Sequence, residues 1–155
     1  MTDFSDLLTP DTILPDLTVS TKKALFQALG AAVADRHGLD PRAVADRLAE
    51  REKLGSTGFG GGIAIPHAKI AGLDGIVGAV ARLAQPIDFA AVDDMGVDIV
   101  FMLLSPPDAG AEHLKMLARV SRALRDPGFV AKLRGAGSRD ALFALLSESE
   151  ARDAA

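Results

Sequence analysis

The chain has 155 residues, with 17 lysines and arginines against 21 aspartates and glutamates and 48% hydrophobic residues. This length suits one domain with a core of its own, so we expect a single domain over residues 1–155. The net charge of −4 argues against nucleic acid, which is bound through Lys and Arg, and the lack of cysteine excludes disulfides and thiol chemistry. No apolar stretch approaches the ~20 residues of a membrane helix, and the acidic start Met1–Asp6 does not begin a secretory signal. We therefore expect a cytoplasmic protein without direct membrane insertion.

Thr12–Leu17 predicts a short strand, and the residues after it predict a helix. Ser20 offers an N-cap, apolar residues then recur at helical spacing, and Gly38 is a typical C-terminal stop. His37 falls at the end of this helix, where a cation is favourable, so we expect a structural role for it.

The second predicted helix carries the first candidate site residue. Asp40 is its N-cap and Pro41 takes the first helical position, a pairing typical of helix starts. Arg51 lies on the same apolar stripe as Val44 and Leu48. Arginine is seldom buried without a partner, and its planar fork suits phosphate or carboxylate. The alternative is that its stem packs while its head reaches water.

Five of the eight residues in Gly55–Gly62 are glycine, and we expect the second helix to end at Gly55 and a loop to follow. Glycines let backbone N–H groups converge on an anion, although a tight surface loop is the alternative. The segment is not a P-loop, which needs Gly-Lys-Ser/Thr, nor a dinucleotide fingerprint, which follows a strand. The candidate anion-binding residues are Ser56, Thr57, Gly58, Gly60, Gly61 and Gly62.

The glycine segment leads directly into Ile63–His67. Side chains alternate along a strand, so Ile63, Ile65 and His67 are expected to point to one side, with Pro66 marking the strand's end. His67 would then be fixed at a strand terminus beside an anion-binding loop. A neutral imidazole is a good nucleophile near neutral pH, so we take His67 as the candidate nucleophile, against the alternative of a structural histidine.

The remainder of the chain predicts two strands and three helices. Ile76–Leu83 is rich in small apolar residues, and the nearly unbroken apolar run Val97–Leu104 suits a strand covered on both faces. Strands that alternate with helices indicate the α/β class. The helices are expected over Ala111–Leu124, Phe129–Arg134 and Ser138–Leu146, followed by a frayed tail over residues 147–155.

His113 is expected in the first turn of the helix over Ala111–Leu124, on its apolar stripe. There the helix dipole favours anions and disfavours a charged histidine, whereas the alternative is a core histidine. The helix follows the expected central strand closely, so its first turn should lie near the strand ends where α/β sites gather. Two histidines, an arginine and a glycine nest suit phosphoryl transfer through a phosphohistidine, because positioning and charge stabilisation dominate such catalysis.

Other chemistries fit the sequence less well. Asp93 and Asp94 predict a turn before the central strand, and no His-Glu-x-x-His or His-x-Glu pattern exists, so we expect no metal and no cofactor. A hydrolase triad of Ser56, His67 and an aspartate stays open, although Ser56 lacks the Gly-x-Ser-x-Gly context.

The run Arg51–His67 (REKLGSTGFGGGIAIPH) resembles the active-site signature of enzyme IIA of the phosphoenolpyruvate:sugar phosphotransferase system. The similarity is to the fructose/mannitol-like (type 2) branch and, within it, to the nitrogen-regulatory type, which the opening Ser5–Pro10 also resembles. Two further blocks match, Pro86–Phe89 leading through Val97–Pro106, and His113 with the residue after it. The resemblance covers nearly the whole chain.

This resemblance implies a mixed, about five-stranded sheet flanked by helices on both faces. It implies that His67 accepts a phosphoryl group on Nε2 from a histidine phosphocarrier protein, itself supplied by enzyme I and phosphoenolpyruvate. Arg51 and His113 would stabilise the transferring group, with Ser56, Thr57 and loop amides nearby. The nitrogen-regulatory type implies regulated protein targets such as potassium transporters or sensor kinases.

Two alternatives to the regulatory reading stay open. One is a sugar-specific enzyme IIA that passes phosphate to a separate IIB component, and the other is a non-catalytic anion-sensing module in which His67 never carries phosphate. Members of the family often carry Asn at the position of Gly61, a departure that concerns the rigidity of the loop. Around His67 we expect a shallow apolar rim of Phe59, Met116 and the strand Ile63–Ile65, suited to docking a partner.

Overall fold

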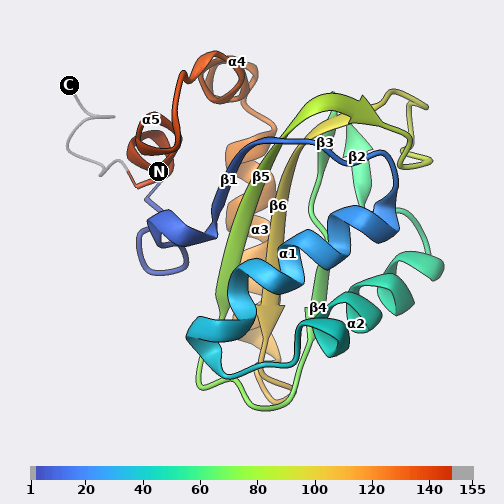
Figure 1. Cartoon of the computed structure of the whole chain (residues 1–155), viewed down its shortest axis with the longest axis vertical. Coiled ribbons are helices and arrows are strands. Elements are labelled where there is room, and N and C mark those ends of the chain that lie inside the picture. The colour runs from blue at the N-terminus through green and yellow to red at the C-terminus, as the bar shows by residue number, and fades with distance from the viewer. Residues whose placement is uncertain (1–2, 148–155) are drawn as a thin grey trace.

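A mixed sheet of six strands lies between two layers of helices in the computed structural model (Figure 1). The structure describes residues 3–147, so the predicted tail lies outside the described residues except for Ser147. No helix in this described part is both long enough and apolar enough to cross a membrane. The helices are the short 3-10 helix η1 (Pro10–Thr12) and α1 (Lys22–His37), α2 (Pro41–Lys53), α3 (Ala111–Leu124), α4 (Pro127–Gly135) and α5 (Arg139–Leu146). The strands are β1 (Ile13–Leu17), β2 (Gly58–Gly60), β3 (Ile63–Ala64), β4 (His67–Lys69), β5 (Val77–Ile87) and β6 (Val97–Ser105).

Strand β6 is the centre of the sheet, whose order is β1-β5-β6-β3-β2, with β4 also paired to β6. β5 runs antiparallel to β6, whereas β3 and β4 run parallel to it and β1 runs parallel to β5. β3 and β4 follow the same side of β6 in one register, because Ile63 faces Ile99 and His67 faces Leu103. The sheet is therefore mixed and flanked by helices, as the sequence predicts.

The predicted single strand Ile63–His67 is divided in the structure. The backbone N–H of Ile65 donates to the carbonyl of Thr57 on the β2 side, and Pro66 has no N–H to donate toward β6. Leu103 keeps the register beyond this point by donating to the carbonyl of Pro66. The prediction of one continuous strand is therefore wrong, whereas His67 does stand at a strand terminus, as the first residue of β4.

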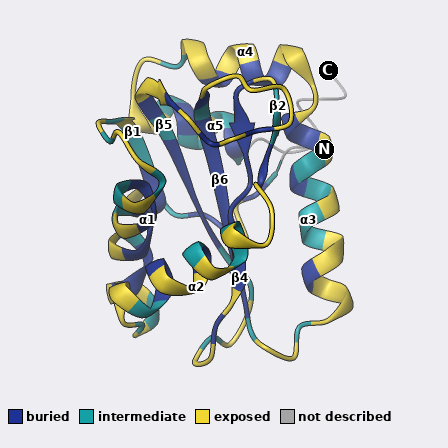
Figure 2. Cartoon of the chain, turned by 90° about the vertical axis from the view of Figure 1, so that its right-hand side faces the viewer, coloured by how far each residue is buried: buried dark blue, intermediate teal, exposed yellow. Residues whose placement is uncertain are grey.

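Apolar side chains cover both faces of the sheet. Figure 2 shows the buried central strands between the helices of the two layers. Helices α1 and α2 pack against one face, and α3, α4 and α5 pack against the other. From Ile99 to Leu104 the fully buried residues of β6 alternate between the two layers, which confirms the prediction of a strand covered on both sides. Toward α1 and α2 these residues are Val100, Met102 and Leu104, and toward the other helices they are Ile99, Phe101 and Leu103.

Most helix ends follow local signals in the sequence. Gly38 ends α1 with φ of 65°, a left-handed conformation that favours glycine, and Asp40 and Ser138 cap α2 and α5 with their side chains. The cap of α1 differs from the prediction, because Thr21 and not Ser20 accepts the backbone N–H bond. Helix α1 thus begins one residue later than a cap at Ser20 would place it.

Candidate active site

Arg51, His67 and His113 line one pocket of about 380 Å³. Arg51 comes from α2, His67 from β4 and His113 from α3. Helices α2 and α3 belong to opposite layers, so the side chains of Arg51 and His113 approach His67 from opposite faces of the sheet. Arg51 Nε lies 3.2 Å from His67 Nε2, and the ring centroids of the two histidines are 5.6 Å apart. The structure therefore brings together three side chains that are far apart in the sequence.

The hydrogen bonds of His67 determine which of its ring nitrogens is free. Nδ1 lies 2.8 Å from the carbonyl oxygen of Ile65. Because a carbonyl can only accept, Nδ1 must carry the hydrogen, and Nε2 keeps its lone pair. The N–H of Arg51 Nε donates to that lone pair. Nε2 is thus the ring nitrogen of His67 that keeps a lone pair, and it lies beside a guanidinium.

The surroundings keep both histidines of the pocket uncharged. Burial lowers the pKa of His67, and the charge of Arg51 lowers it further, against the opposing effects of the Ile65 carbonyl and Glu52. Burial likewise lowers the pKa of His113, with smaller contributions from His67 and Lys69. A neutral imidazole is the form that can attack phosphorus, so His67 is ready to react near neutral pH.

His113 is the third residue of α3 and is only 7% exposed. Its Nδ1 makes a hydrogen bond with the hydroxyl of Ser105, which ends β6 and is fully buried. The sequence analysis did not single out Ser105, because it is the last residue of an apolar strand and carries no motif of its own.

The glycine-rich segment forms a hairpin and not an open loop. Helix α2 ends at Lys53, earlier than predicted, and β2 pairs antiparallel with β3. Gly61 and Gly62 make the turn with φ of 67° and 83°, in the region that L side chains rarely adopt. The concentration of glycine is explained in part by this turn.

Glu52 fastens the start of this hairpin to α2. Its side chain is 7% exposed and accepts from the backbone N–H of Thr57 at 3.1 Å, from Thr57 Oγ1 at 2.6 Å and from Lys22 Nζ at 2.7 Å. A buried carboxylate requires partners of this kind. Glu52 follows Arg51 in the sequence, so this network also holds the end of α2 from which Arg51 reaches His67. Only the folded chain reveals its burial.

The other donors of the glycine segment also have partners within the protein. Ser56 Oγ donates to the carbonyl of Phe89 at 2.6 Å, and Gly61 N donates to the carboxylate of Asp93 at 3.0 Å. The pocket around His67 is lined by residues other than 56–62. The proposed triad lacks its contact between Ser56 and His67, and the role of residues 56–62 in binding a phosphoryl group stays a prediction.

None of the apolar residues expected around His67 lines the pocket, whose apolar side chains are Leu54 and Ala68. Leu54, at the end of α2, is 84% exposed, and Leu114, beside His113 on α3, is 67% exposed. The strand residues Ile63–Ile65 are buried, Phe59 lines a different pocket, and Met116 packs against the α3–α5 side of the core. The pocket is lined by Arg47, Glu50, Arg51, Leu54, His67, Ala68, Lys69 and His113.

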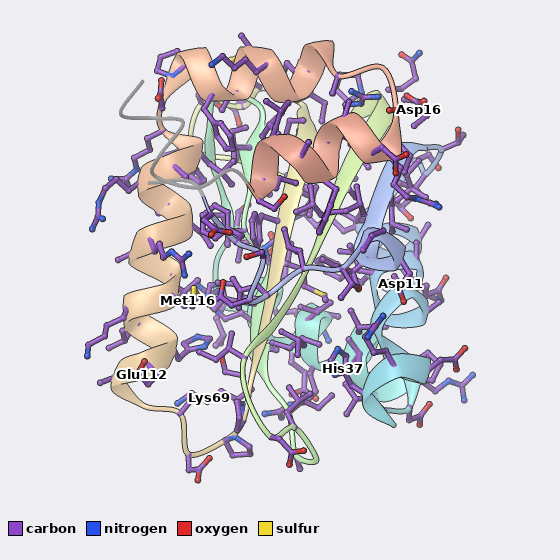
Figure 3. All side chains as sticks on the ribbon, turned by 90° about the vertical axis from the view of Figure 1, so that its left-hand side faces the viewer. Asp11, Asp16, His37, Lys69, Glu112 and Met116 are labelled. Atoms are coloured by element: carbon purple, nitrogen blue, oxygen red, sulfur yellow. The ribbon has the colours of Figure 1, made fainter. Side chains whose placement is uncertain are left out.

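The third histidine of the chain lies away from this site. Figure 3 shows Lys69 of β4 and Glu112 of α3 at one end of the molecule, with His37 on the other side of the sheet. His37 is the last residue of α1, as predicted.

A family model and two similar proteins point to the same protein family. Residues 6–149 match the family described as "Phosphoenolpyruvate-dependent sugar phosphotransferase system, EIIA 2". The chain is 48% identical over 143 residues to a nitrogen regulatory protein of Bradyrhizobium diazoefficiens, covering 92% of this chain and 94% of that protein. It is 36% identical over 149 residues to a PTS system fructose-specific EIIA component of Haloferax volcanii, covering 96% and 97% of the two chains.

The fold has a close counterpart among solved structures. The crystal structure of nitrogen regulatory protein IIA-Ntr from Neisseria meningitidis matches with a TM-score of 0.86 and 35% sequence identity, covering 91% of this chain and 97% of that one. The structural match agrees with the mixed sheet and its flanking helices. The chain therefore belongs to the EIIA 2 family of the phosphoenolpyruvate-dependent sugar phosphotransferase system, among its nitrogen regulatory IIA-Ntr members.

Proposed function

We propose that His67 accepts a phosphoryl group on Nε2 from a histidine phosphocarrier protein, and that the chain regulates protein partners according to its phosphorylation state. The observation that carries this proposal is the hydrogen bond from His67 Nδ1 to the carbonyl of Ile65, which leaves Nε2 unprotonated beside Arg51. Membership of the EIIA 2 family supports the class of donor, because the family is part of a phosphoenolpyruvate-dependent relay.

The proposed transfer needs no group beyond the side chains of the pocket. The lone pair of His67 Nε2 forms a bond to phosphorus while the bond from phosphorus to the donor's histidine nitrogen breaks, and the donor nitrogen keeps that electron pair. Positive charge builds on the His67 ring, where the Ile65 carbonyl stabilises the Nδ1–H. Arg51 and His113 would donate to the phosphoryl oxygens, where stabilisation of developing charge is the main source of catalysis.

Phosphorylation would change the surface that a partner meets. The unphosphorylated pocket is lined by the cations Arg47, Arg51 and Lys69, by the anion Glu50 and by the exposed Leu54, and the exposed Leu114 follows the lining residue His113 in the chain. A phosphoryl group adds roughly 1.5–2 negative charges near neutral pH. Such a group is unfavourable against an apolar or acidic partner surface and favourable against one that offers Arg, Lys or a helix N-terminus. The two states would therefore select different protein targets, such as potassium transporters or sensor kinases.

The test is phosphorylation in a reconstituted relay of phosphoenolpyruvate, enzyme I and the phosphocarrier protein, followed by intact mass measurement. Wild-type protein and the control His37→Ala should each gain one phosphoryl group, whereas His67→Ala should gain none. The modification should be labile in acid and stable in base, as a phosphoramidate is. A phosphoryl group on His67→Ala would refute the assignment, and an unmodified wild-type protein would favour an anion-sensing module.

A sugar-specific role is the second candidate, because the chain is also similar to a fructose-specific EIIA component. Affinity capture with unphosphorylated protein, phosphorylated protein and His67→Ala distinguishes the two roles. Regulation predicts different partners for the two phosphorylation states. Identical partner sets in all three would contradict the switch, and capture of a sugar permease's IIB component alone would favour transport.

A further inference from the structure

Ser105 lies behind the candidate active site, at the end of the central strand. It is fully buried and pairs with Lys69 in the β4–β6 register, where its carbonyl accepts from Ile70 N at 2.9 Å. Its hydroxyl contacts Nδ1 of His113, eight residues further along the chain. The proposed phosphoryl transfer to His67 does not involve this hydroxyl directly.

The burial of Ser105 decides the direction of its bond to His113. Within residues 3–147, Nδ1 of His113 is the one hydrogen-bond partner of Ser105 Oγ. If Nδ1 carried the ring hydrogen, the hydroxyl hydrogen would be left inside the protein without an acceptor, which is unfavourable. The hydroxyl therefore donates to Nδ1. The hydrogen of the neutral His113 ring must then be on Nε2.

We propose that Ser105 is a positioning residue that fixes His113 as the Nε2–H tautomer, so that the two histidines of the pocket hold opposite tautomers. The Ile65 carbonyl leaves His67 with a lone pair on Nε2, whereas the Ser105 hydroxyl leaves His113 with an N–H on Nε2. The functional consequence rests on the proposed function: His67 is the nucleophile, and His113 is a neutral donor for a phosphoryl oxygen.

The opposite tautomer of His113 would work against transfer. The centroids of the His67 and His113 rings are 5.6 Å apart, so a phosphoryl group on His67 would lie next to His113. In the opposite tautomer, Nε2 of His113 would present a lone pair to a phosphoryl oxygen, and the two would repel each other. Protonation of both nitrogens would supply a donor, but the ring would then carry a charge in a pocket that already holds Arg51 and Lys69. A hydroxyl that donates to Nδ1 avoids both outcomes.

The first experiment measures the tautomers in the unphosphorylated protein by long-range ¹H–¹⁵N correlation of the histidine rings. We expect His113 with hydrogen on Nε2 and His67 with hydrogen on Nδ1. A His113 ring with its hydrogen on Nδ1 would overturn the proposal. This spectrum does not depend on phosphoryl transfer, so it decides the role of Ser105 even if His67 is never phosphorylated.

The second experiment compares Ser105→Thr with Ser105→Val, because these side chains have nearly the same shape and differ in the hydroxyl. Ser105→Thr should keep the His113 tautomer and the rate of phosphoryl transfer. Ser105→Val and the smaller Ser105→Ala should give a mixture of tautomers and a rate roughly 3- to 10-fold lower, the effect of one lost hydrogen bond. Equal transfer rates and equal spectra for Ser105→Thr and Ser105→Val would show that the hydroxyl has no role beyond packing and would overturn the proposal. An unchanged His113 spectrum in Ser105→Ala would overturn it as well.

Discussion

His67 and His113 are chemically identical side chains in one pocket, and their neighbours give them different roles. A backbone carbonyl holds Nδ1 of His67, and a buried hydroxyl holds Nδ1 of His113. Each neighbour fixes one nitrogen and so determines what the other can offer, a lone pair in one case and a hydrogen in the other. In the proposed transfer, the different roles of the two histidines would follow from these two hydrogen bonds.

The lowered pKa of His67 predicts how transfer depends on pH. Burial keeps this pKa below the ordinary value near 6.5, so at that pH a smaller fraction of the ring is protonated than of a free imidazole. We expect the transfer rate to fall with decreasing pH, with its midpoint below pH ~6.5. An NMR titration of the His67 ring measures the pKa directly, and a value at or above that of a free histidine would contradict this account.

The same shift predicts how His67 affects stability. The unfolded chain binds the proton of His67 more readily than the folded chain does, so the free energy of unfolding should decrease as pH falls below ~6.5. Urea unfolding of the wild type and of His67→Gln should differ in this pH dependence, with the shallower decrease in the variant.

Arg51→Ala and His113→Ala should both slow phosphoryl transfer to His67. Each removes a donor from the pocket, a change that typically lowers the rate by about 10²–10³-fold. Rapid-quench measurement of phosphoryl transfer tests this expectation. The control is Arg36→Ala, because Arg36 forms an exposed ion pair with Asp11. Wild-type rates in both pocket variants would mean that these side chains are only packing residues.

Among the structural elements, the hairpin of β2 and β3 connects α2 to the strand that carries His67. Glu52 holds Thr57 at the start of this hairpin, and Asp93 holds Gly61 at its turn. Beyond the turn, β3 and β4 follow β6 in one register. The position of His67 is therefore fixed by strand pairing, and the hairpin supports that pairing from one side.

The turn of this hairpin gives a pair of substitutions with different expected effects. Gly61 has φ of 67° and open space around the position of a Cβ, and Asn tolerates this conformation better than most residues, so Gly61→Asn should change the free energy of unfolding by less than about 1 kcal/mol. A Cβ on Gly62, at φ of 83°, would lie 2.9 Å from Asp98 Oδ1 and would disturb the ion pair of Asp98 with Arg134. Gly62→Ala should therefore destabilise by about 1–3 kcal/mol.

Urea unfolding at neutral pH compares the two turn variants. Equal free energies of unfolding for Gly61→Asn and Gly62→Ala would show that the turn does not constrain these glycines as described. The comparison also bears on the departure at Gly61, where the family often has Asn, because a neutral result would mean that either residue serves the turn.

Elements with local signals could be predicted from the sequence, and elements that depend on distant partners could not. The boundaries of α3 and the cap of α2 at Asp40 follow from spacing and capping over a few residues. The interruption at Pro66 depends on pairing with β6, and the closure of the glycine segment depends on carboxylates at Glu52 and Asp93. His67 could be proposed as the phosphoryl acceptor from its motif, whereas Ser105 could be recognised only from its burial and its contact with His113.

On the scale of the whole molecule, the site is a local concentration of cations on a chain of net charge −4. Two large leucines near the site are mostly exposed: Leu54, which lines the pocket just after α2, and Leu114 on α3, which follows the lining residue His113. Exposed apolar side chains next to a charged centre are typical of a protein interface, in which apolar anchors contribute affinity and charges contribute selectivity.

Leu54→Ser and Leu114→Ser should weaken binding of the phosphocarrier protein without affecting the fold. Both side chains are mostly exposed, so their truncation removes contact with a partner and little packing, and each should raise the dissociation constant roughly 5- to 30-fold. Isothermal titration calorimetry measures this effect. The matched control is Val92→Ser, because Val92 is 82% exposed in the loop between β5 and β6, outside the pocket. An equal effect at Val92, or none at either leucine, would contradict the docking role.

The most direct test of the central claim is the position of the phosphoryl group on the ring. Long-range ¹H–¹⁵N correlation of uniformly ¹⁵N-labelled protein, recorded after phosphorylation by the relay, identifies the substituted nitrogen. The structure predicts one phosphohistidine, with phosphorus on Nε2 of His67 and the hydrogen of Nδ1 still bonded to the Ile65 carbonyl. A phosphoryl group on Nδ1 of His67, or on either nitrogen of His113, would contradict the account.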